Sequence, residues 1–204
     1  MQDPSPLDQD ISLIQRFKEG DSSAFDELVI KYQSKVFNTA YRMLSSYEDA
    51  NDMAQEVFIR AYKSLLKFRG DSKFYTWLYR ITVNSCINRL KSHKRTIPLS
   101  YCAQSGARIE PTLAHSHDGE PMNKLERREL QRHVQNAISS LPDRYRCVVV
   151  LRDIQGLHYQ EIAKVMECSL EAVRSSLYRA RKKLKRELKH IAPLIMNGVK
   201  EGTK

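Results

Sequence analysis

Residues 157–189 read LHYQEIAKVMECSLEAVRSSLYRARKKLKRELK, and this stretch decides the fold of the chain. Its first part, Tyr159–Met166, places apolar residues at helical spacing and predicts a short helix. The next three residues leave room only for a tight turn ending in Ser169, a residue type that caps helices. A longer helix is predicted from Leu170 to about Leu188. Its apolar residues recur on one helix face: Val173, Leu177, Ala180, Leu184 and Leu188.

Two helices joined by a three-residue turn match the helix-turn-helix, whose second helix enters the major groove of DNA. Residues 174–189 hold eight basic residues and one acidic residue, a net charge of +7. A merely solvated basic helix end would carry similar charge, but the short helix and the turn before it favour DNA binding. The candidates for contact with base edges are Arg174, Ser175, Tyr178 and Arg179. The candidates for contact with phosphates are Lys182, Lys183, Lys185 and Arg186.

The composition fits a nucleic-acid-binding protein of one or two small domains. The chain has 204 residues, 41% of them hydrophobic, with a net charge of +10 and a pI near 9.5. The charge is uneven, because residues 1–30 carry seven acidic and two basic residues. The basic excess lies in residues 80–95 and in the last predicted helix. A protein that only coated polyanions would not need an acidic front half.

The cysteines and the hydropathy pattern argue against metal sites, cofactors and direct membrane insertion. The four cysteines are widely spaced: Cys86, Cys102, Cys147 and Cys168. Without a CxxC pair they are typical of thiols in a reducing compartment, not of a zinc finger. Cys102 with His115 and His117 is too loosely spaced for a metal site. No apolar run reaches about 18 residues and no signal peptide is visible, so we expect a cytoplasmic protein.

Three helices are predicted before residue 68. Their predicted caps are Asp8 or Asp10, Asp21 or Ser22, and Ser46 with Asp49. Gly20 is expected to end the first helix, which carries Ile11, Ile14 and Phe17. The third helix offers a polar and acidic patch: Glu48, Asp49, Asp52, Gln55 and Glu56. Acids in a first turn complement the helix dipole, so the residues alone leave that reading open beside a docking surface.

A fourth helix is predicted from Asp71 or Ser72 to about Lys94, with two different faces. Its apolar side holds Tyr79, Val83, Ile87 and Leu90. A second stripe, about 90° away, holds Lys73, Trp77, Arg80, Asn84, Asn88, Lys91 and Arg95. Asparagine pairs with base edges, and arginine and lysine hold phosphate. Aromatic residues crowd the same region: Phe68, Phe74, Tyr75, Trp77 and Tyr79. Any one of them fits an ordinary core, but aromatic faces beside cations also hold unpaired bases, at roughly 1–3 kcal/mol each.

These residues resemble a known family. Residues 49–62 (DANDMAQEVFIRAY) and 68–81 (FRGDSKFYTWLYRI) resemble region 2 of an extracytoplasmic function (ECF) sigma factor of bacterial RNA polymerase, most closely the sigma-E branch. Leu141-Pro142, residues 153–163 (DIQGLHYQEIA) and residues 173–175 resemble region 4 of the same family. The resemblance implies an all-α fold with two small helical domains. We expect region 2 at residues 8–95, a flexible linker at 96–125 and region 4 at 126–192.

The resemblance also implies partners and roles. Region 2 would dock on the β′ clamp helices of core RNA polymerase through Asp52, Gln55 and Glu56. Region 2 would recognise and melt the −10 element of promoter DNA, with one flipped base held in the loop that ends near Tyr75. The residues implied there are Phe68, Lys73, Tyr75, Trp77, Arg80, Asn84, Asn88 and Lys91. Region 4 would sit on the β flap and read the −35 element through Arg174, Ser175, Tyr178, Arg179 and Lys182. An anti-sigma factor is the expected regulator.

Two details of the sequence qualify these expectations. Relatives often have arginine where this chain has Ser176, and an apolar aromatic where it has Tyr178, which leaves the exact −35 sequence open. The helical spacing places Ser176 at the flank of the buried face. The linker, with about 28 residues, would span about 30 Å on average and roughly 95 Å when extended. Tethering would then raise the effective concentration of each domain on one duplex.

Two other classes of protein compete with this interpretation. A helix-turn-helix regulator that is not a polymerase subunit would bind duplex sites alone, but the aromatic and asparagine stripe of the fourth helix argues against it. A protein-protein adaptor would use the basic helix on an acidic partner, but two DNA-facing surfaces argue against that. The sequence has no GxxxxGK[ST], HExxH or GxSxG motif. We therefore expect an initiation factor and not an enzyme.

Overall fold

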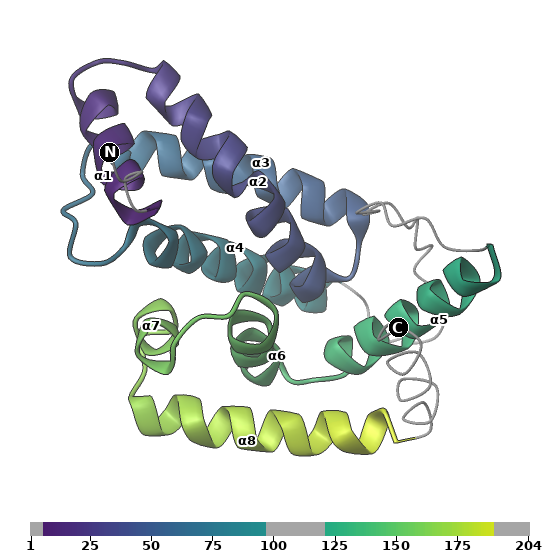
Figure 1. The fold of residues 1–204 in the computed structure, drawn as a ribbon. Helices are drawn as coiled ribbons and strands as arrows, with labels where there is room; N and C mark the ends of the chain where they lie inside the picture. The colour runs from purple at the N-terminus through teal and green to yellow at the C-terminus, as the bar shows by residue number, and fades with distance from the viewer. Residues whose placement is uncertain (1–5, 97–120, 190–204) are drawn as a thin grey trace, which may run out of the picture.

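The computed structural model describes residues 6–96 and 121–189, and every regular element within these ranges is helical (Figure 1). An N-terminal unit contains α1 (Pro6–Lys18), α2 (Ser23–Leu44), α3 (Tyr47–Leu65) and α4 (Phe74–Thr96). A C-terminal unit contains α5 (Pro121–Ser139), α6 (Asp143–Val149), the π-helical turn η1 (Val150–Ile154), α7 (Tyr159–Val165) and α8 (Leu170–Glu187). This architecture confirms the all-α prediction.

The core of the N-terminal unit lies where α2, α3 and α4 meet. The apolar stripes predicted for these helices supply it, since Leu28, Val36, Met53, Val57 and Val83 are almost fully buried. Full burial of such side chains stabilises the fold by about 1.5–3 kcal/mol each. Three other apolar residues predicted for these helices, Phe58, Ile87 and Leu90, are only partly buried and pack against this core.

The start of α1 differs from the prediction at Asp10. The sequence favoured Asp8 or Asp10 as a cap, but α1 begins at Pro6, and Asp10 lies inside the helix with 2% of its surface exposed. Its carboxylate accepts hydrogen bonds from Lys31 Nζ at 2.7 Å and from Tyr32 Oη at 2.6 Å. The cap prediction was wrong for Asp10 because a buried carboxylate found a cation and a hydroxyl on the next helix.

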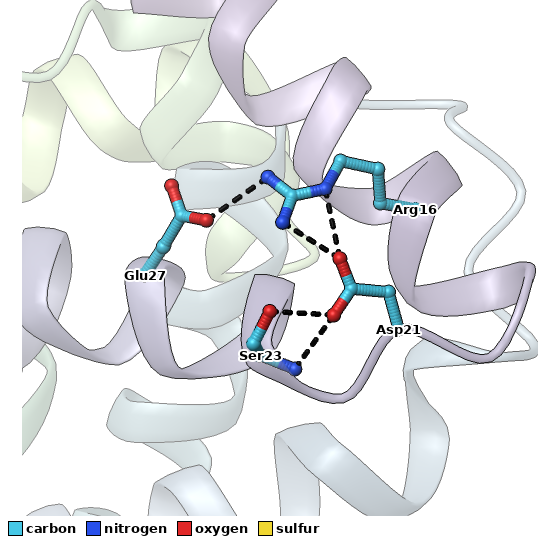
Figure 2. A network of polar contacts seen from close by, with 4 residues as sticks. All are labelled: Arg16, Asp21, Ser23 and Glu27. Carbon is cyan, nitrogen blue, oxygen red and sulfur yellow. Dashed lines mark hydrogen bonds and ion pairs between the residues drawn. The ribbon is translucent and has the colours of Figure 1, made fainter.

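The turn between α1 and α2 is held by a polar network (Figure 2). Gly20 takes a φ of +105°, which suits a residue without a side chain. Asp21 Oδ1 then accepts from Ser23 N at 3.0 Å and from Ser23 Oγ at 2.5 Å. Arg16 donates to Asp21 Oδ2 through Nε at 2.9 Å, and to Glu27 Oε1 through Nη1 at 2.9 Å. Hydrogen bonds from Ser23 and then Arg16 lower the pKa of Asp21 below its ordinary value.

Two other helix starts follow the predicted caps. Ser46 accepts a hydrogen bond from Asp49 N at 3.2 Å at the start of α3. Ser169 accepts one from Ala172 N, also at 3.2 Å, at the start of α8. Both residues take the extended backbone conformation that a capping residue needs.

The two units pack against each other, although their chain positions are far apart. Figure 1 shows α6 and α7 between α4 and α8, and buried residues of both units form one hydrophobic cluster. The core of the C-terminal unit is built mainly by Leu151, Ile162, Val173, Leu177 and Ala180. Helix α5 begins at Pro121, inside the segment assigned to the linker, and proline is well suited to a first helical position.

One side of this packing is a buried joint at the C-terminal end of α2. Arg146 donates through Nη1 to Met43 O at 2.6 Å and through Nη2 to Leu141 O at 3.2 Å and to Ser139 O. Arg42 Nη1 donates to Gln135 Oε1 at 2.8 Å. No signal in the sequence predicted this joint between α2, α5 and α6.

The thiols of Cys86 and Cys147 are buried and unpaired, and burial raises the pKa of each to about 12. Cys168 is a free, partly buried thiol. Cys102, His115 and His117 lie outside the described residues. In residues 6–96 and 121–189, no helix is both long and apolar enough to span a bilayer. Within the same ranges, no three His, Cys, Asp or Glu side chains are grouped as a metal site requires.

Candidate nucleic-acid interface

The first candidate surface is the outer face of α8. All five residues predicted there are exposed: Arg174, Ser175, Tyr178, Arg179 and Lys182. Tyr178 is the aromatic residue of this face, and 69% of its surface is exposed. Ser176 is 5% exposed and belongs to the buried side, as its spacing predicted. The face is therefore a continuous polar and basic strip with one aromatic ring.

Helix α8 is tied to η1 by an ion pair at the edge of this face, because Arg181 lies one helical turn from Tyr178 and two from Arg174. Arg181 binds Asp153 of η1 through both carboxylate oxygens, at 3.2 Å from Nε and 2.5 Å from Nη2. The ion pair with Asp153 raises the pKa of Arg181. Arg152 donates from Nη1 to Leu157 O at 2.8 Å, and its guanidinium lies 5.1 Å from the ring centre of Tyr159. Arg181 is exposed but already paired within its own unit, so it has a structural role on α8.

The second candidate surface runs along α4. Asn84, Asn88 and Lys91 are exposed on one side of the helix, opposite buried Val83 and Cys86. Arg95, which continues the predicted stripe, lies where side chains are not described. This side of α4 thus presents two amides and a cation at i, i+4 and i+7, on one helix face.

The aromatic residues at the start of α4 divide into core and surface. Phe74 is 3% exposed and is core, as is Tyr79 at 4%. Phe68 and Trp77 are only partly buried, and their ring centres lie 5.2 Å apart. Together they line a cleft of about 840 Å³. The N-terminal unit also contributes Lys67, Arg69, Asp71, Ser72, Thr76 and Arg80 to this cleft.

The C-terminal unit forms the other wall of the same cleft. Ala163 and Lys164 of α7 line it, as do Glu167, Cys168 and Ser169 of the following turn. The cleft therefore lies between the predicted −10 surface and the first half of the helix-turn-helix.

Polar contacts between the units surround this cleft. Lys73 Nζ lies 3.0 Å from Glu161 Oε1, and Tyr75 Oη donates a hydrogen bond to the same oxygen. Arg80 Nη1 lies 3.6 Å from Glu167 Oε1. We call these five residues the clasp. No pattern in the sequence indicated the clasp, because Glu161 and Glu167 resemble ordinary acidic surface residues of a helix-turn-helix.

Local contacts hold Glu161 as a carboxylate. Its Oε2 accepts from His158 N at 2.9 Å at the start of α7. Burial of the Glu161 carboxyl opposes its charge, but hydrogen bonds from Tyr75, His158 N and Lys73 outweigh it and lower its pKa. A hydrogen bond with Tyr75 and then one with Glu161 raise the pKa of Lys73. At this contact, Lys73 of the N-terminal unit is therefore a cation and Glu161 of the C-terminal unit is a carboxylate.

The third candidate surface is the outer side of α3. Asp52 and Gln55 are exposed, and Glu56 is partly buried and pairs with Arg60. Asp49 is drawn toward Arg89 of α4, with 3.6 Å between the charged atoms. Further along this helix and just after it lie exposed apolar side chains that were not predicted: Ile59, Tyr62 and Leu66. Their spacing of three and four residues was the available signal.

Comparisons with known proteins identify the family of the chain. Residues 28–96 match the family model of Sigma-70 region 2, and residues 131–184 match that of Sigma-70 region 4. The chain is 40% identical to the RNA polymerase sigma-H factor of Pseudomonas aeruginosa over 182 residues, covering 89% of this chain and 94% of that protein. It is 41% identical to the ECF RNA polymerase sigma-E factor of Escherichia coli K12 over 184 residues, covering 90% and 94%.

Solved structures give the same fold. CnrH in complex with the cytosolic domain of CnrY superposes with a TM-score of 0.67 at 26% identity, covering 90% of this chain and 99% of that one. RpoE of Bartonella quintana, bound to the anti-sigma factor NepR, superposes with a TM-score of 0.63 at 21% identity, covering 81% and 96%.

A helical chain in which a region 2 unit precedes a region 4 unit is a transcription initiation factor of the sigma-70 class. The chain belongs to the extracytoplasmic function family of RNA polymerase sigma factors. It is an alternative sigma factor, which directs core polymerase to promoters and is not itself an enzyme.

Proposed function

We propose that this sigma factor holds a promoter at two places, as duplex on α8 and as an unpaired strand on α4 and its preceding loop. The observation that carries the proposal is the presence of two separate basic surfaces of different chemistry. The α8 surface is an open helix face, whereas the α4 surface adjoins a cleft with two aromatic rings. An open helix face suits a major groove, and an aromatic cleft suits single bases.

The −35 element would be read by the first turns of α8. Arg174, Ser175, Tyr178 and Arg179 would reach base edges, with Arg174 and Arg179 suited to guanine. Lys182, one turn further along, would hold a phosphate. The burial of Ser176 removes that position from the reading face. Relatives often have arginine at this position, and its replacement by Ser176 would therefore have little direct effect on base contacts.

The −10 element would be read by α4 and the loop before it. Asn84 and Asn88 would pair with base edges, while Lys73, Arg80 and Lys91 would hold the backbone. Phe68, Tyr75 and Trp77 would surround an unstacked base. Extruding a base costs a few kcal/mol, and trapping it on aromatic rings returns a similar amount. Promoter opening would thus be driven by capture of exposed bases.

Core polymerase would dock on the outer side of α3. Asp52, Gln55 and Glu56 would meet the β′ clamp helices, and exposed Ile59 and Tyr62 would add apolar contact on the same helix. Region 4 would meet the β flap. Both partners and the promoter lie in the cytoplasm, which is where we place the protein.

An anti-sigma factor is the regulator that best fits the comparisons. The Bartonella RpoE was solved with the anti-sigma factor NepR, and CnrH was solved with the cytosolic domain of CnrY. We expect this chain to be held inactive by a partner of the same kind until a stress signal releases it.

Run-off transcription with core polymerase and a promoter library tests the proposal. Addition of this protein should start transcripts at new sites, and permanganate should detect unpaired thymines near −10. A helix-turn-helix regulator acting alone would bind duplex DNA but would create no new start sites. A duplex footprint without new transcripts would therefore favour that alternative class.

A further inference from the structure

The cleft between the two units is lined by basic side chains to which no DNA contact has been assigned. Lys67 and Arg69 line it from the loop after α3, and Lys164 lines it from α7. All three side chains are exposed. Within residues 6–96 and 121–189, none of the three makes a side-chain hydrogen bond or ion pair. Three unpaired cations around one cavity favour an anionic ligand.

The charge balance of the cleft suits a ligand with several negative charges. Arg80 also lines the cleft, but Glu167 lies 3.6 Å from it and offsets its charge. Asp71 is the other acidic residue of the lining. Four basic and two acidic side chains leave a net charge of +2. The beginning of the 18-residue helix α8 at Ser169 adds the positive end of a helix dipole. A polyphosphate matches this surface better than a single carboxylate does.

The same cleft contains an aromatic surface for a flat ring. Phe68 and Trp77 are only partly buried, with their ring centres 5.2 Å apart and their planes inclined at 54°. Aromatic side chains of this kind stack on nucleobases of any sequence. The cleft volume of about 840 Å³ lies within the range of about 300–1,000 Å³ that small-molecule sites occupy. The cavity therefore has room for a base, a sugar and several phosphates.

We propose that the cleft binds a free nucleoside polyphosphate, whose base lies against Phe68 and Trp77. Its phosphates lie between Lys67 and Arg69 of the N-terminal unit and Lys164 of the C-terminal unit. This ligand is a small soluble molecule and is therefore a different partner from promoter DNA and from polymerase.

The grouping of the cations favours a free nucleotide over a strand of nucleic acid. A strand on α4 carries one phosphate charge per nucleotide, spread along its length. A nucleoside polyphosphate brings several charges into the space of one nucleotide. Lys164 belongs to the helix-turn-helix unit, so the cations of the cleft come from both of its walls.

The test uses the full-length protein, with ATP and GTP as probes. Trp77 is the one tryptophan of the chain and lines the cleft, so a purine that stacks on its ring should quench the protein fluorescence in a saturable way. Isothermal titration calorimetry measures the same affinity independently.

Two double variants with equal loss of charge are compared. The cleft variant combines Lys67→Gln with Lys164→Gln and so removes one cation from each wall. The control combines Lys35→Gln with Lys183→Gln, at exposed positions of α2 and α8 that do not line the cleft. Circular dichroism should confirm that both variants are folded.

The wild type and the control should bind ATP or GTP with equal affinity. The cleft variant should bind roughly tenfold or more weakly, because two charge-assisted hydrogen bonds are lost. Lys164→Gln alone should weaken binding about threefold or more, since its wall belongs to the other unit. Adenosine, which lacks phosphates, should bind at least about tenfold more weakly than ATP. The same is expected of inorganic pyrophosphate, which lacks a base, by about tenfold.

Any of four results would overturn the proposal. Neither quenching nor heat with millimolar ATP and GTP would mean that the cleft takes no nucleotide. Equal affinities of the two double variants would place the binding outside the cleft. Pyrophosphate binding as tight as that of ATP would leave only a general polyanion surface. A single-stranded −10 oligonucleotide should bind both double variants alike, and a loss confined to the cleft variant would assign these cations to the strand.

Discussion

Asp21, in the turn between α1 and α2, should make the stability of the protein depend on pH. Hydrogen bonds from Ser23 and Arg16 favour the charged carboxylate and lower its pKa in the folded protein. A depressed pKa contributes stability above the unfolded value of about 3.9, and this contribution is lost as the pH falls through the folded pKa. Asp21→Asn should therefore unfold at less urea than the wild type at neutral pH, and the gap should narrow in acid. A gap that stays constant across urea titrations from pH 7 to below 3.9 would contradict this.

Other single residues show what could be predicted from the sequence at this scale. Ser46 and Ser169 could be assigned as caps, because a cap depends only on residues within one turn of it. The cap role predicted for Asp10 was wrong, since its partners Lys31 and Tyr32 are more than twenty residues away. A carboxylate near a helix start has several local uses, and only the packing of α1 on α2 decides among them.

At the scale of elements, the exposed faces of α4 and α8 were predictable and the contacts of these helices with other elements were not. The face of α8 follows from the spacing of Val173, Leu177 and Ala180, so its outer residues could be assigned from the sequence alone. The same holds for Asn84 and Asn88 on α4. The roles of Arg181 and Glu161 could not be assigned, because their partners Asp153, Lys73 and Tyr75 lie on other elements.

Arg174→Ala combined with Arg179→Ala should weaken binding of −35 duplex DNA by about tenfold or more, since each arginine contact to a base is worth about 1–3 kcal/mol. Footprinting at −35 measures the loss. Initiation should be spared on a promoter redesigned to work without that element. The matched control combines Lys35→Ala with Arg132→Ala, which removes the same charge from exposed residues of α2 and α5. A −35 footprint that the double variant leaves intact would refute the assignment.

Asn84→Ala combined with Asn88→Ala should impair promoter opening more than polymerase binding. Both amides are exposed on α4, and the residues assigned to polymerase docking lie on α3. Permanganate reactivity at −10 should fall by about tenfold or more if each amide pairs with a base edge. Affinity for core polymerase, measured by fluorescence anisotropy of labelled protein, should stay within about twofold. Parallel losses in both assays would place these residues in folding or docking.

At the scale of the whole molecule, the sequence predicted two helical units but not their contact. The joint depends on single polar residues such as Arg42, Gln135 and Arg146, which have no periodic pattern and lie about ninety to a hundred residues from their partners. Long-range pairing of this kind leaves no trace in the helical spacing of one sequence. The mutual packing of the units was therefore visible only in three dimensions.

Arg146→Met should destabilise the whole protein by about 1–3 kcal/mol, because the carbonyls of Met43, Leu141 and Ser139 would lose their donor. Methionine fills similar space, so the effect would report hydrogen bonding more than a cavity. Urea unfolding followed by both Trp77 fluorescence and circular dichroism measures it. Arg144→Met, at an exposed position of the same helix, should change stability little. Equal stabilities for the two variants would show that the hydrogen bonds of Arg146 contribute nothing to the free energy of unfolding.

The uncovered face of α8 has a consequence for the cellular population of this protein. A basic helix face that is accessible in the free protein would adhere to any stretch of chromosome, independent of sequence and with an affinity that falls as salt rises. Copies not yet recruited by polymerase would then form a reservoir spread along the genome. Recruitment would draw on molecules already sliding near promoters, and it would not have to wait for encounters from bulk solution.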